Sequence, residues 1–185
     1  YSHESGRTFK RLPLVHSAHI LNSNALTSDW DQVVAPVELN YILGNPPFIG
    51  SNLMTSEMRM ELRSTMPEVP NTGLLDYVSA WYVKTLKIMK SNPLVEAALV
   101  STNSITQGEQ VGVLWKYLVE QGVHINFAHQ PFKWSNDAKG NAAVDCVIVG
   151  YSLKNNKQKY LFEYKDIRSE PILESVDYEY HLILW

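Results

Sequence analysis

A short apolar segment that ends in two prolines places the strongest constraint on what this chain can fold into. Tyr41-Ile42-Leu43-Gly44 predicts a buried strand, and Asn45-Pro46-Pro47-Phe48 follows it directly. Neither proline has an N–H group to donate, and Pro46 restricts Asn45 to an extended backbone. The strand must therefore end in a rigid tip whose backbone carbonyls are left as unpaired acceptors.

This tip has the chemistry to hold an exocyclic amine. The side-chain carbonyl of Asn45 and the main-chain carbonyl of Pro46 are neighbouring acceptors, and a planar amino group has two hydrogens that need two partners. The ring of Phe48 offers an aromatic face for a flat substrate. The alternative interpretation is a rigid strand-to-loop turn without chemistry.

The first half of the chain alternates apolar runs with segments of helical spacing. His19–Leu21 predicts a further buried strand, and Thr55 or Ser56 caps a short helix that ends near Arg63. The Pro- and Gly-containing segment 66–73 breaks this helix and is a candidate for a mobile lid. Apolar residues with helical spacing then predict a helix of about four turns, with Asp76 in its first turn. These residues are Leu74, Leu75, Val78, Trp81, Tyr82, Leu86 and Met89.

The second half predicts a β-loop-α unit followed by strands without an intervening helix. Val95–Val100 reads as a strand, and a helix carrying Trp115 follows it and stops at Gly122. The runs 123–128 and 142–153 should pair antiparallel, and 159–164 is a possible last strand. The chain therefore predicts an α/β fold with a mixed, mainly parallel sheet that ends in an antiparallel hairpin. In such sheets ligands gather at the carboxyl ends of strands, where Asn24, Asn45 and Asn103 would lie.

Composition limits the classes of function. With 185 residues, 45% of them hydrophobic, the chain can form one ordinary core. Its net charge of −3 argues against a module that binds DNA tightly on its own. Cys146 is the only cysteine, which excludes a disulfide framework and cysteine-rich zinc sites, and the histidine spacing predicts no metal site. No apolar run approaches the roughly 18 residues that span a bilayer, and no signal peptide is recognisable, so we expect a cytoplasmic protein without a membrane partner.

Several segments resemble, in the same order, the MmeI-like class of bacterial DNA adenine methyltransferases, which use S-adenosylmethionine (SAM). Besides Asn45–Phe48, these are Asn24–Leu26, Asp29-Trp30, Gly44–Gly50, Leu75–Tyr82, Ser101–Ile105, Gln107–Gln110 and Ala128–Gly150. The resemblance runs from about residue 20 to about residue 153. It implies a Rossmann-like class I SAM-dependent methyltransferase fold, of which 1–153 would be the C-terminal part of the catalytic domain. Residues 154–185 would be a trailing segment that approaches a target-recognition domain.

The resemblance also implies roles for individual residues in the transfer of a methyl group to a flipped adenine in DNA. The catalytic residues would be Asn45, Pro46, Pro47 and Phe48. The target base would stack on Phe48, Phe132 and Trp134. The cofactor would contact Asn24, Ala25, Asn45 and Asp76. For Trp134 a loop cover over the core is the alternative, and for Asp76 a charge at a helix N-terminus. DNA would be bound through a longer parent protein, with a fused nuclease and a target-recognition domain as possible further parts.

The sequence departs from the class in one respect. Methyltransferases of this class resemble one another in an aromatic-x-Gly-x-Gly turn for the cofactor, but Gly6 is the only glycine before Gly44. We therefore expect a fragment that is inactive alone.

Two other functions remain open. A methyltransferase of RNA or of protein glutamine would use nearly the same tip, because a glutamine amide is also a planar amino group. The other is a non-catalytic nucleic-acid-binding module, against which the intact Asn45 argues.

Overall fold

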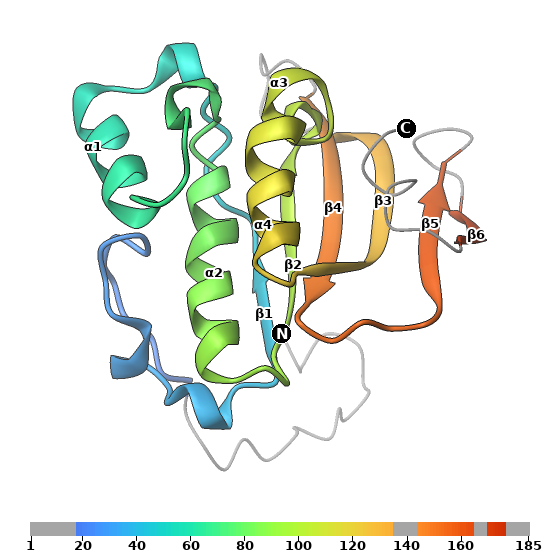
Figure 1. Cartoon of the computed structure of the whole chain (residues 1–185), viewed down its shortest axis with the longest axis horizontal. Helices are drawn as coiled ribbons and strands as arrows, with labels where there is room; N and C mark the ends of the chain where they lie inside the picture. The colour runs from blue at the N-terminus through green and yellow to red at the C-terminus, as the bar shows by residue number, and fades with distance from the viewer. Residues whose placement is uncertain (1–17, 135–143, 165–169, 177–185) are drawn as a thin grey trace, which may run out of the picture.

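A six-stranded sheet forms the centre of the molecule (Figure 1). The computed structural model of the chain describes residues 18–134, 144–164 and 170–176. The strands run in the spatial order β1-β2-β4-β3-β5-β6. Their bounds are β1 Tyr41–Gly44, β2 Glu96–Thr102, β3 His124–Trp134, β4 Val144–Ser152, β5 Lys159–Glu163 and β6 Ile172–Val176.

The sheet is mixed, as the sequence predicts for this α/β fold. Strand β1 pairs parallel with β2, and β3 pairs parallel with β5. The other three neighbouring pairs are antiparallel, including the predicted pairing of β3 with β4. Parallel pairing is thus less prevalent among the described strands than expected, because β4 lies between β2 and β3 and runs antiparallel to both.

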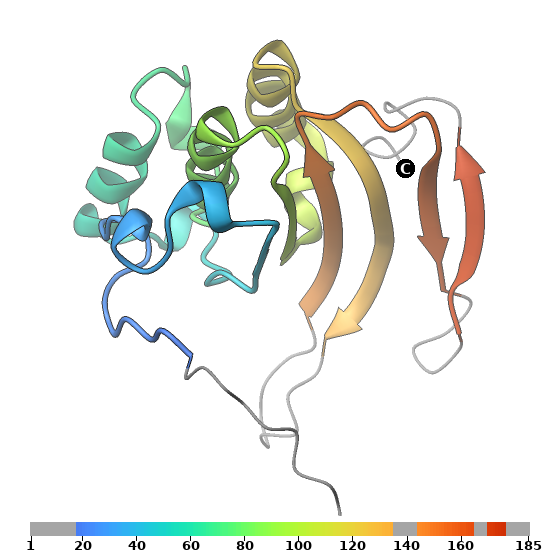
Figure 2. The same ribbon diagram turned by 90° about the horizontal axis from the view of Figure 1, so that it is seen from below.

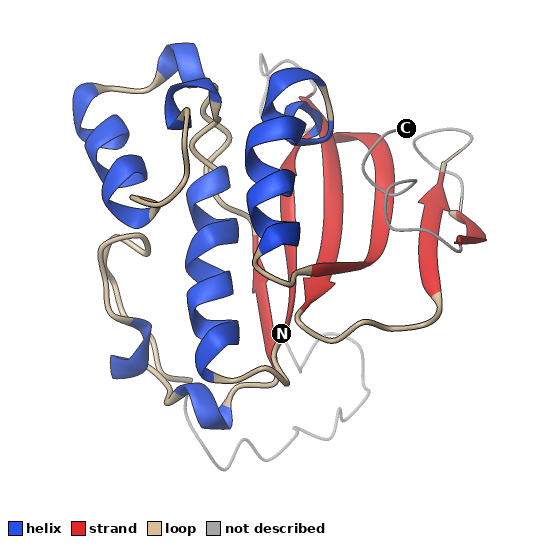
Figure 3. Ribbon diagram, viewed as in Figure 1, coloured by secondary structure: helices blue, strands red, loops and turns tan. Residues whose placement is uncertain are grey.

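Helices cover one face of this sheet at the end formed by β1, β2 and β4, and none of the described helices lies over β5 and β6 (Figures 2 and 3). Helix α1 spans Ser56–Thr65 and α2 spans Ser79–Ser91. A third helical stretch is continuous from residue 108 to residue 120 and consists of α3 Gly108–Gln110, the π-helical turn η6 Val111–Trp115 and α4 Lys116–Glu120. Within the described ranges, five 3₁₀ turns complete the helical elements: η1 Trp30–Gln32, η2 Pro36–Glu38, η3 Ser51–Leu53, η4 Thr72–Leu74 and η5 Asn103–Thr106.

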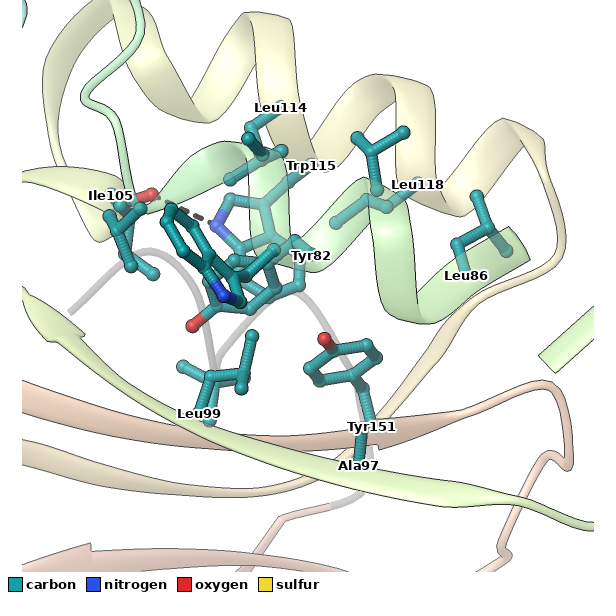
Figure 4. Close-up of a cluster of buried hydrophobic side chains, with 14 of the residues drawn as sticks. Tyr82, Leu86, Ala97, Leu99, Ile105, Leu114, Trp115, Leu118 and Tyr151 are labelled. Atoms are coloured by element: carbon teal, nitrogen blue, oxygen red, sulfur yellow. Dashed lines mark hydrogen bonds between the residues drawn. The ribbon is translucent and has the colours of Figure 1, made fainter. Parts of the chain in front are cut away.

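The core lies between α2, the 108–120 helical stretch and the sheet (Figure 4). Tyr82 of α2 stacks on Tyr151 of β4 with ring centroids 5.2 Å apart, and meets Trp115 edge to face at 5.4 Å. The Trp115 indole N–H donates to the Ile105 carbonyl at 2.9 Å, so its polar atom is satisfied inside the core. Such aromatic pairs add to the free energy gained from apolar burial and fix how the helices sit on the sheet.

Cys146 of β4 is fully buried, as its apolar sequence context indicates. Burial raises the pKa of its thiol to about 11, so the thiol stays protonated near neutral pH. The protonated thiol is a poor nucleophile, which fits an inert packing role. Within the described residues, no helix combines the length and the apolar character that crossing a membrane requires.

Two strand predictions need correction. Residues 19–21 form no strand, and Ile20 and Leu21 are 87% and 48% exposed. A strand needs a hydrogen-bonded neighbour, and no described strand lies beside this run. Strand β1 forms where predicted but is not fully buried, since Tyr41 and Leu43 are 69% and 77% exposed. It is an edge strand, and described helices cover only the opposite face.

Helix boundaries also differ from the prediction in one place. Thr55 caps α1 as expected, its side chain accepting from the Met58 N–H. However, α2 begins at Ser79 rather than at residue 74, so Asp76 precedes the helix instead of lying in its first turn. The reason is tertiary, because distant groups bind Asp76: the Gln110 side chain accepts from its backbone N–H, and the Ser51 N–H and the Ser104 hydroxyl donate to its carboxylate.

The segment after α1 was a candidate for a mobile lid, and its packing disfavours that role. Met66 and Val69 are only 1% and 6% exposed and belong to the core. Lifting the segment would bring both side chains into water, at a cost of roughly 1.5–3 kcal/mol each.

Candidate active site

A cavity of about 580 Å³ opens at the end of β1 and contains most of the predicted site residues. Several segments line it. The loop before η1 contributes Asn24 and Ala25, and η1 contributes Trp30; the strand tip contributes Asn45, Pro46 and Pro47; and the region around the start of α2 contributes Tyr77 and Trp81. Apolar residues of β1, α1, β2 and the loop after the tip complete the lining. Pockets for small molecules commonly have this size. The fold therefore joins the predicted catalytic tip to the predicted cofactor loop.

The tip itself combines an exposed amide with a buried anchor. Pro46 is buried, whereas Asn45 and Pro47 are exposed, so the Asn45 side chain is accessible from the cavity. Phe48 is half-buried and does not line the cavity. The tip thus presents the Asn45 amide at the cavity, on a backbone anchored by the buried Pro46.

Hydrogen bonds hold the loop that follows the tip. The Ser51 N–H donates to Asp76 Oδ1 at 2.8 Å, and the Tyr77 N–H donates to the Ile49 carbonyl at 2.9 Å. The Arg59 guanidinium donates to the Ser51 carbonyl at 2.7 Å. The segment before α2 and helix α1 therefore fix the backbone directly after Phe48.

Asp76 uses its polar groups inside the protein. Its Oδ2 accepts from the Ser104 hydroxyl at 2.5 Å, and its N–H donates to Gln110 Oε1 at 3.0 Å. The side chain is 7% exposed and lies outside the cavity lining. A cofactor contact by Asp76 stays a prediction, whereas its observed contacts tie the loop after Phe48 to the segments that follow β2.

Asn24 is held on both sides of its amide group. Its Nδ2 donates to Glu61 Oε1 at 2.7 Å, and its Oδ1 accepts from the Leu26 N–H at 2.9 Å. The Tyr77 hydroxyl donates to the other carboxylate oxygen of Glu61. Burial, followed by the hydrogen bond to Glu61, raises the pKa of the Tyr77 phenol, which therefore stays a donor. Sequence reasoning missed Glu61, whose only sequence feature is its place in an amphipathic helix.

Lys84 holds the loop that carries Ala25. Its ammonium group donates to the carbonyls of Ala25, Leu26 and Ser28 at 2.6, 2.8 and 2.5 Å. It also lies 5.0 Å from the centroid of the Trp30 ring, within the range of a cation–π contact. Burial lowers the pKa of Lys84 below its ordinary value, and the charge of Asp29 opposes this shift. No local sequence signal marks Lys84, because its partners lie 56 to 59 residues away.

The structure does not bring Phe132 into this cavity. Phe132 is in β3, opposite Cys146 of β4, and its ring centroid lies 5.8 Å from that of Tyr164. Strands β3 and β1 are three strand spacings apart, or about 14 Å. The side chain of Trp134 lies outside the described residues, as does the connection that follows it. In the part of the chain that is described, no group of three or more His, Cys, Asp or Glu residues could hold a metal ion.

Comparison with known proteins identifies the family. Residues 1–163 match the family described as MmeI, DNA-methyltransferase domain, and the chain belongs to this family. The resemblance drawn from the sequence segments is thereby confirmed. The chain is 44% identical over 154 residues to DNA methyltransferase A of Bacillus subtilis (strain 168). This match covers 82% of the chain but 17% of the relative.

A solved structure gives the same result for the fold. The type IIL restriction-modification enzyme MmeI, determined in complex with DNA, superposes with a TM-score of 0.83 and 44% sequence identity. The match covers 95% of this chain and 23% of that protein. The chain thus spans less than a quarter of the length of either relative.

Proposed function

We propose that this chain forms part of the active site of a SAM-dependent enzyme that methylates the exocyclic amine of adenine in DNA. The observation that carries the proposal is the cavity that joins the tip residues Asn45 and Pro46 to Asn24 and Ala25. The family membership supports DNA methylation as the activity of the full-length parent protein.

The cavity suits a cofactor that carries a flat ring with polar groups. The rings of Trp30, Tyr77 and Trp81 form aromatic walls, and the amide groups of Asn24 and Asn45 supply donors and acceptors. Asn24, Ala25 and Asn45 are the residues we assign to holding SAM. When bound, SAM supplies a methyl group made reactive by its positively charged sulfonium.

The role of the tip is to prepare the nucleophile. The nitrogen of an adenine amine is a poor nucleophile because its lone pair is delocalised into the ring. Two acceptors, the Asn45 side-chain oxygen and the Pro46 carbonyl, would bind the two amine hydrogens and favour the pyramidal geometry that frees the lone pair. Catalysis would then depend on positioning and fixed dipoles rather than on a general base.

The target base would reach the tip by flipping out of the duplex, at a cost of a few kcal/mol. Stacking is worth about 1–3 kcal/mol per base and would offset part of this cost. Phe48 is the proposed stacking partner beside the tip, with Phe132 and Trp134 on the far side. Since the chain has a net charge of −3, we propose that most phosphate contacts are made by other parts of the parent protein, where a target-recognition domain and a nuclease would also lie.

The test measures transfer of a labelled methyl group from SAM by the full-length parent protein. The substrates are unmethylated DNA, RNA and, for the protein-glutamine alternative, a release factor. We expect labelled DNA carrying N6-methyladenine, and a loss of at least about 100-fold in rate for Asn45→Ala, in line with removal of an electrostatic contact to the reacting group. Asn52→Ala is the matched control, since Asn52 is exposed on the same loop and lies outside the cavity lining.

The outcomes separate the candidate functions. Label in RNA or in release factor would favour the alternative amine substrates. No transfer to any of the three by a folded parent would leave the non-catalytic nucleic-acid-binding module as the better account.

A further inference from the structure

We propose that Glu61 is a positioning residue that sets the orientation of the Asn24 amide at the cofactor side of the cavity. Glu61 is not itself among the lining residues, whereas its two partners, Asn24 and Tyr77, both are. It would therefore act through them. The inference rests on the proposed function, because it concerns how the same cavity recognises its cofactor.

Glu61 connects the walls of the cavity from outside. From helix α1 its carboxylate accepts from Asn24 Nδ2 at 2.7 Å and from the Tyr77 hydroxyl. Tyr77 in turn packs edge to face on Trp81 with ring centroids 5.2 Å apart. One carboxylate thus fixes the first loop of the cavity relative to the region where α2 begins.

An amide side chain can usually be turned over at little cost, because its oxygen and nitrogen differ little in size. At Asn24 this freedom is removed from both sides. The Leu26 N–H, 2.9 Å from Asn24 Oδ1, needs an acceptor at that position. The Glu61 carboxylate, 2.7 Å from Asn24 Nδ2, needs a donor. The Asn24 amide is thus held in one orientation, in which its amino group faces Glu61 and the Tyr77 hydroxyl and one lone pair of its oxygen remains to accept a hydrogen bond. The exocyclic amino group of the cofactor adenine is a donor from which this oxygen can accept, and a carboxylate at position 24 would keep that acceptor.

The same contact explains why position 24 carries an amide in this chain. A carboxylate at position 24 would meet the Glu61 carboxylate across a 2.7 Å contact, and like charges at that separation repel strongly. Placing the carboxylate at position 24 and the amide at position 61 removes this repulsion. With Asn24→Asp and Glu61→Gln together, the new amide at position 61 donates to the new carboxylate and still accepts from Tyr77. The net charge is unchanged.

The experiment is a double-mutant cycle on the full-length parent protein, with SAM affinity measured by isothermal titration calorimetry. We expect Asn24→Asp to weaken SAM binding by about tenfold or more, in line with the pKa shifts that neighbouring carboxylates cause. The double variant Asn24→Asp/Glu61→Gln should return to within about threefold of wild type, because every partner is again satisfied. Glu57→Gln is the matched control, since it removes the same charge from an exposed position in α1.

A structural role alone is distinguished by thermal unfolding without SAM. If the cycle shows coupling in the melting temperature but SAM binds all folded variants equally, Glu61 only stabilises the fold and the inference is wrong. It is also wrong if Asn24→Asp weakens SAM binding equally with Glu or Gln at position 61. Failure of the wild-type parent to bind SAM would instead overturn the proposed function itself.

Discussion

Asp76 shows how a single side chain can control a loop without belonging to the cavity. Its two carboxylate oxygens bind the Ser51 N–H and the Ser104 hydroxyl, and the Ser104 hydroxyl also lies 2.8 Å from that of Thr102. A carboxylate that accepts a backbone N–H is a strong hydrogen-bond partner. We infer that Asp76 holds the loop after Phe48 in place.

Replacing Asp76 should therefore affect both stability and methyl transfer. Asp76→Ala leaves the Ser51 N–H without its acceptor and should cost about 1–3 kcal/mol of unfolding free energy. Asp76→Asn keeps one acceptor and should cost less. Urea unfolding and single-turnover methyl transfer by the parent protein measure the two effects. A variant of normal stability whose SAM affinity alone falls would point instead to the cofactor contact that the sequence predicts.

Gly150 of β4 is a second residue whose environment makes a definite prediction. A Cβ atom at this position would lie 2.0 Å from Cε1 of Phe127, so Gly150→Ala must displace the ring. We expect a loss of about 1–3 kcal/mol, typical of overpacking.

Gly112 provides the matched comparison for Gly150. It lies in a helical turn, and a Cβ there would meet nothing within 4 Å. Gly112→Ala should be neutral or stabilising by up to about 1 kcal/mol, because alanine loses less conformational freedom in a helix. Urea midpoints of the two variants give the test, and equal destabilisation would contradict it.

At the scale of elements, stacked rings attach β5 to the rest of the sheet. His129 of β3 stacks on Phe162 of β5 with centroids 4.4 Å apart and planes 10° apart, and its Nδ1 lies 2.6 Å from the Tyr164 hydroxyl. The described part of 154–185 thus extends the same sheet as the preceding residues. Its relation to a target-recognition domain stays a prediction.

The burial of His129 against Phe162 should make the free energy of unfolding depend on pH. Burial lowers the pKa of His129 below its ordinary value of 6.5, so in mildly acidic solution the unfolded chain binds the proton that the folded state resists. The contribution of neutral His129 to the free energy of unfolding is fully present above about pH 6.5. It is lost as the pH falls towards and through the pKa of His129 in the folded state.

His129→Phe keeps the stacking and removes the titrating group. The variant should show a smaller fall in unfolding free energy between pH 7 and pH 5 than wild type, as measured by urea unfolding at both values. The same fall in both proteins would assign the dependence to other groups.

At the scale of the whole molecule, the cavity predicts that SAM stabilises the parent protein. A ligand that binds only the folded state at 100 times its Kd adds about 2.7 kcal/mol. The melting temperature should therefore rise with SAM concentration, while methionine, which lacks the ring that the aromatic walls would hold, should have little effect. A shift with DNA but none with SAM would support the non-catalytic module.

The sequence by itself determined the features that depend on neighbouring residues. The prolines at 46 and 47 end β1 through their covalent structure, Thr55 caps α1 three residues from its partner, and apolar spacing located β2, β3 and β4. Matching segments in the same order also identified the family. These signals are local, so they can be read without knowing the fold.

The tertiary structure alone decided which distant groups meet. Glu61 finds Asn24 across 37 residues, and Lys84 finds Ala25 across 59. Residues 19–21 look like a strand but lack a partner beside them, and the insertion of β4 between β2 and β3 set the balance of parallel and antiparallel pairing. Hydrogen bonds and strand pairing require two groups at one place, and only the folded chain brings such groups together.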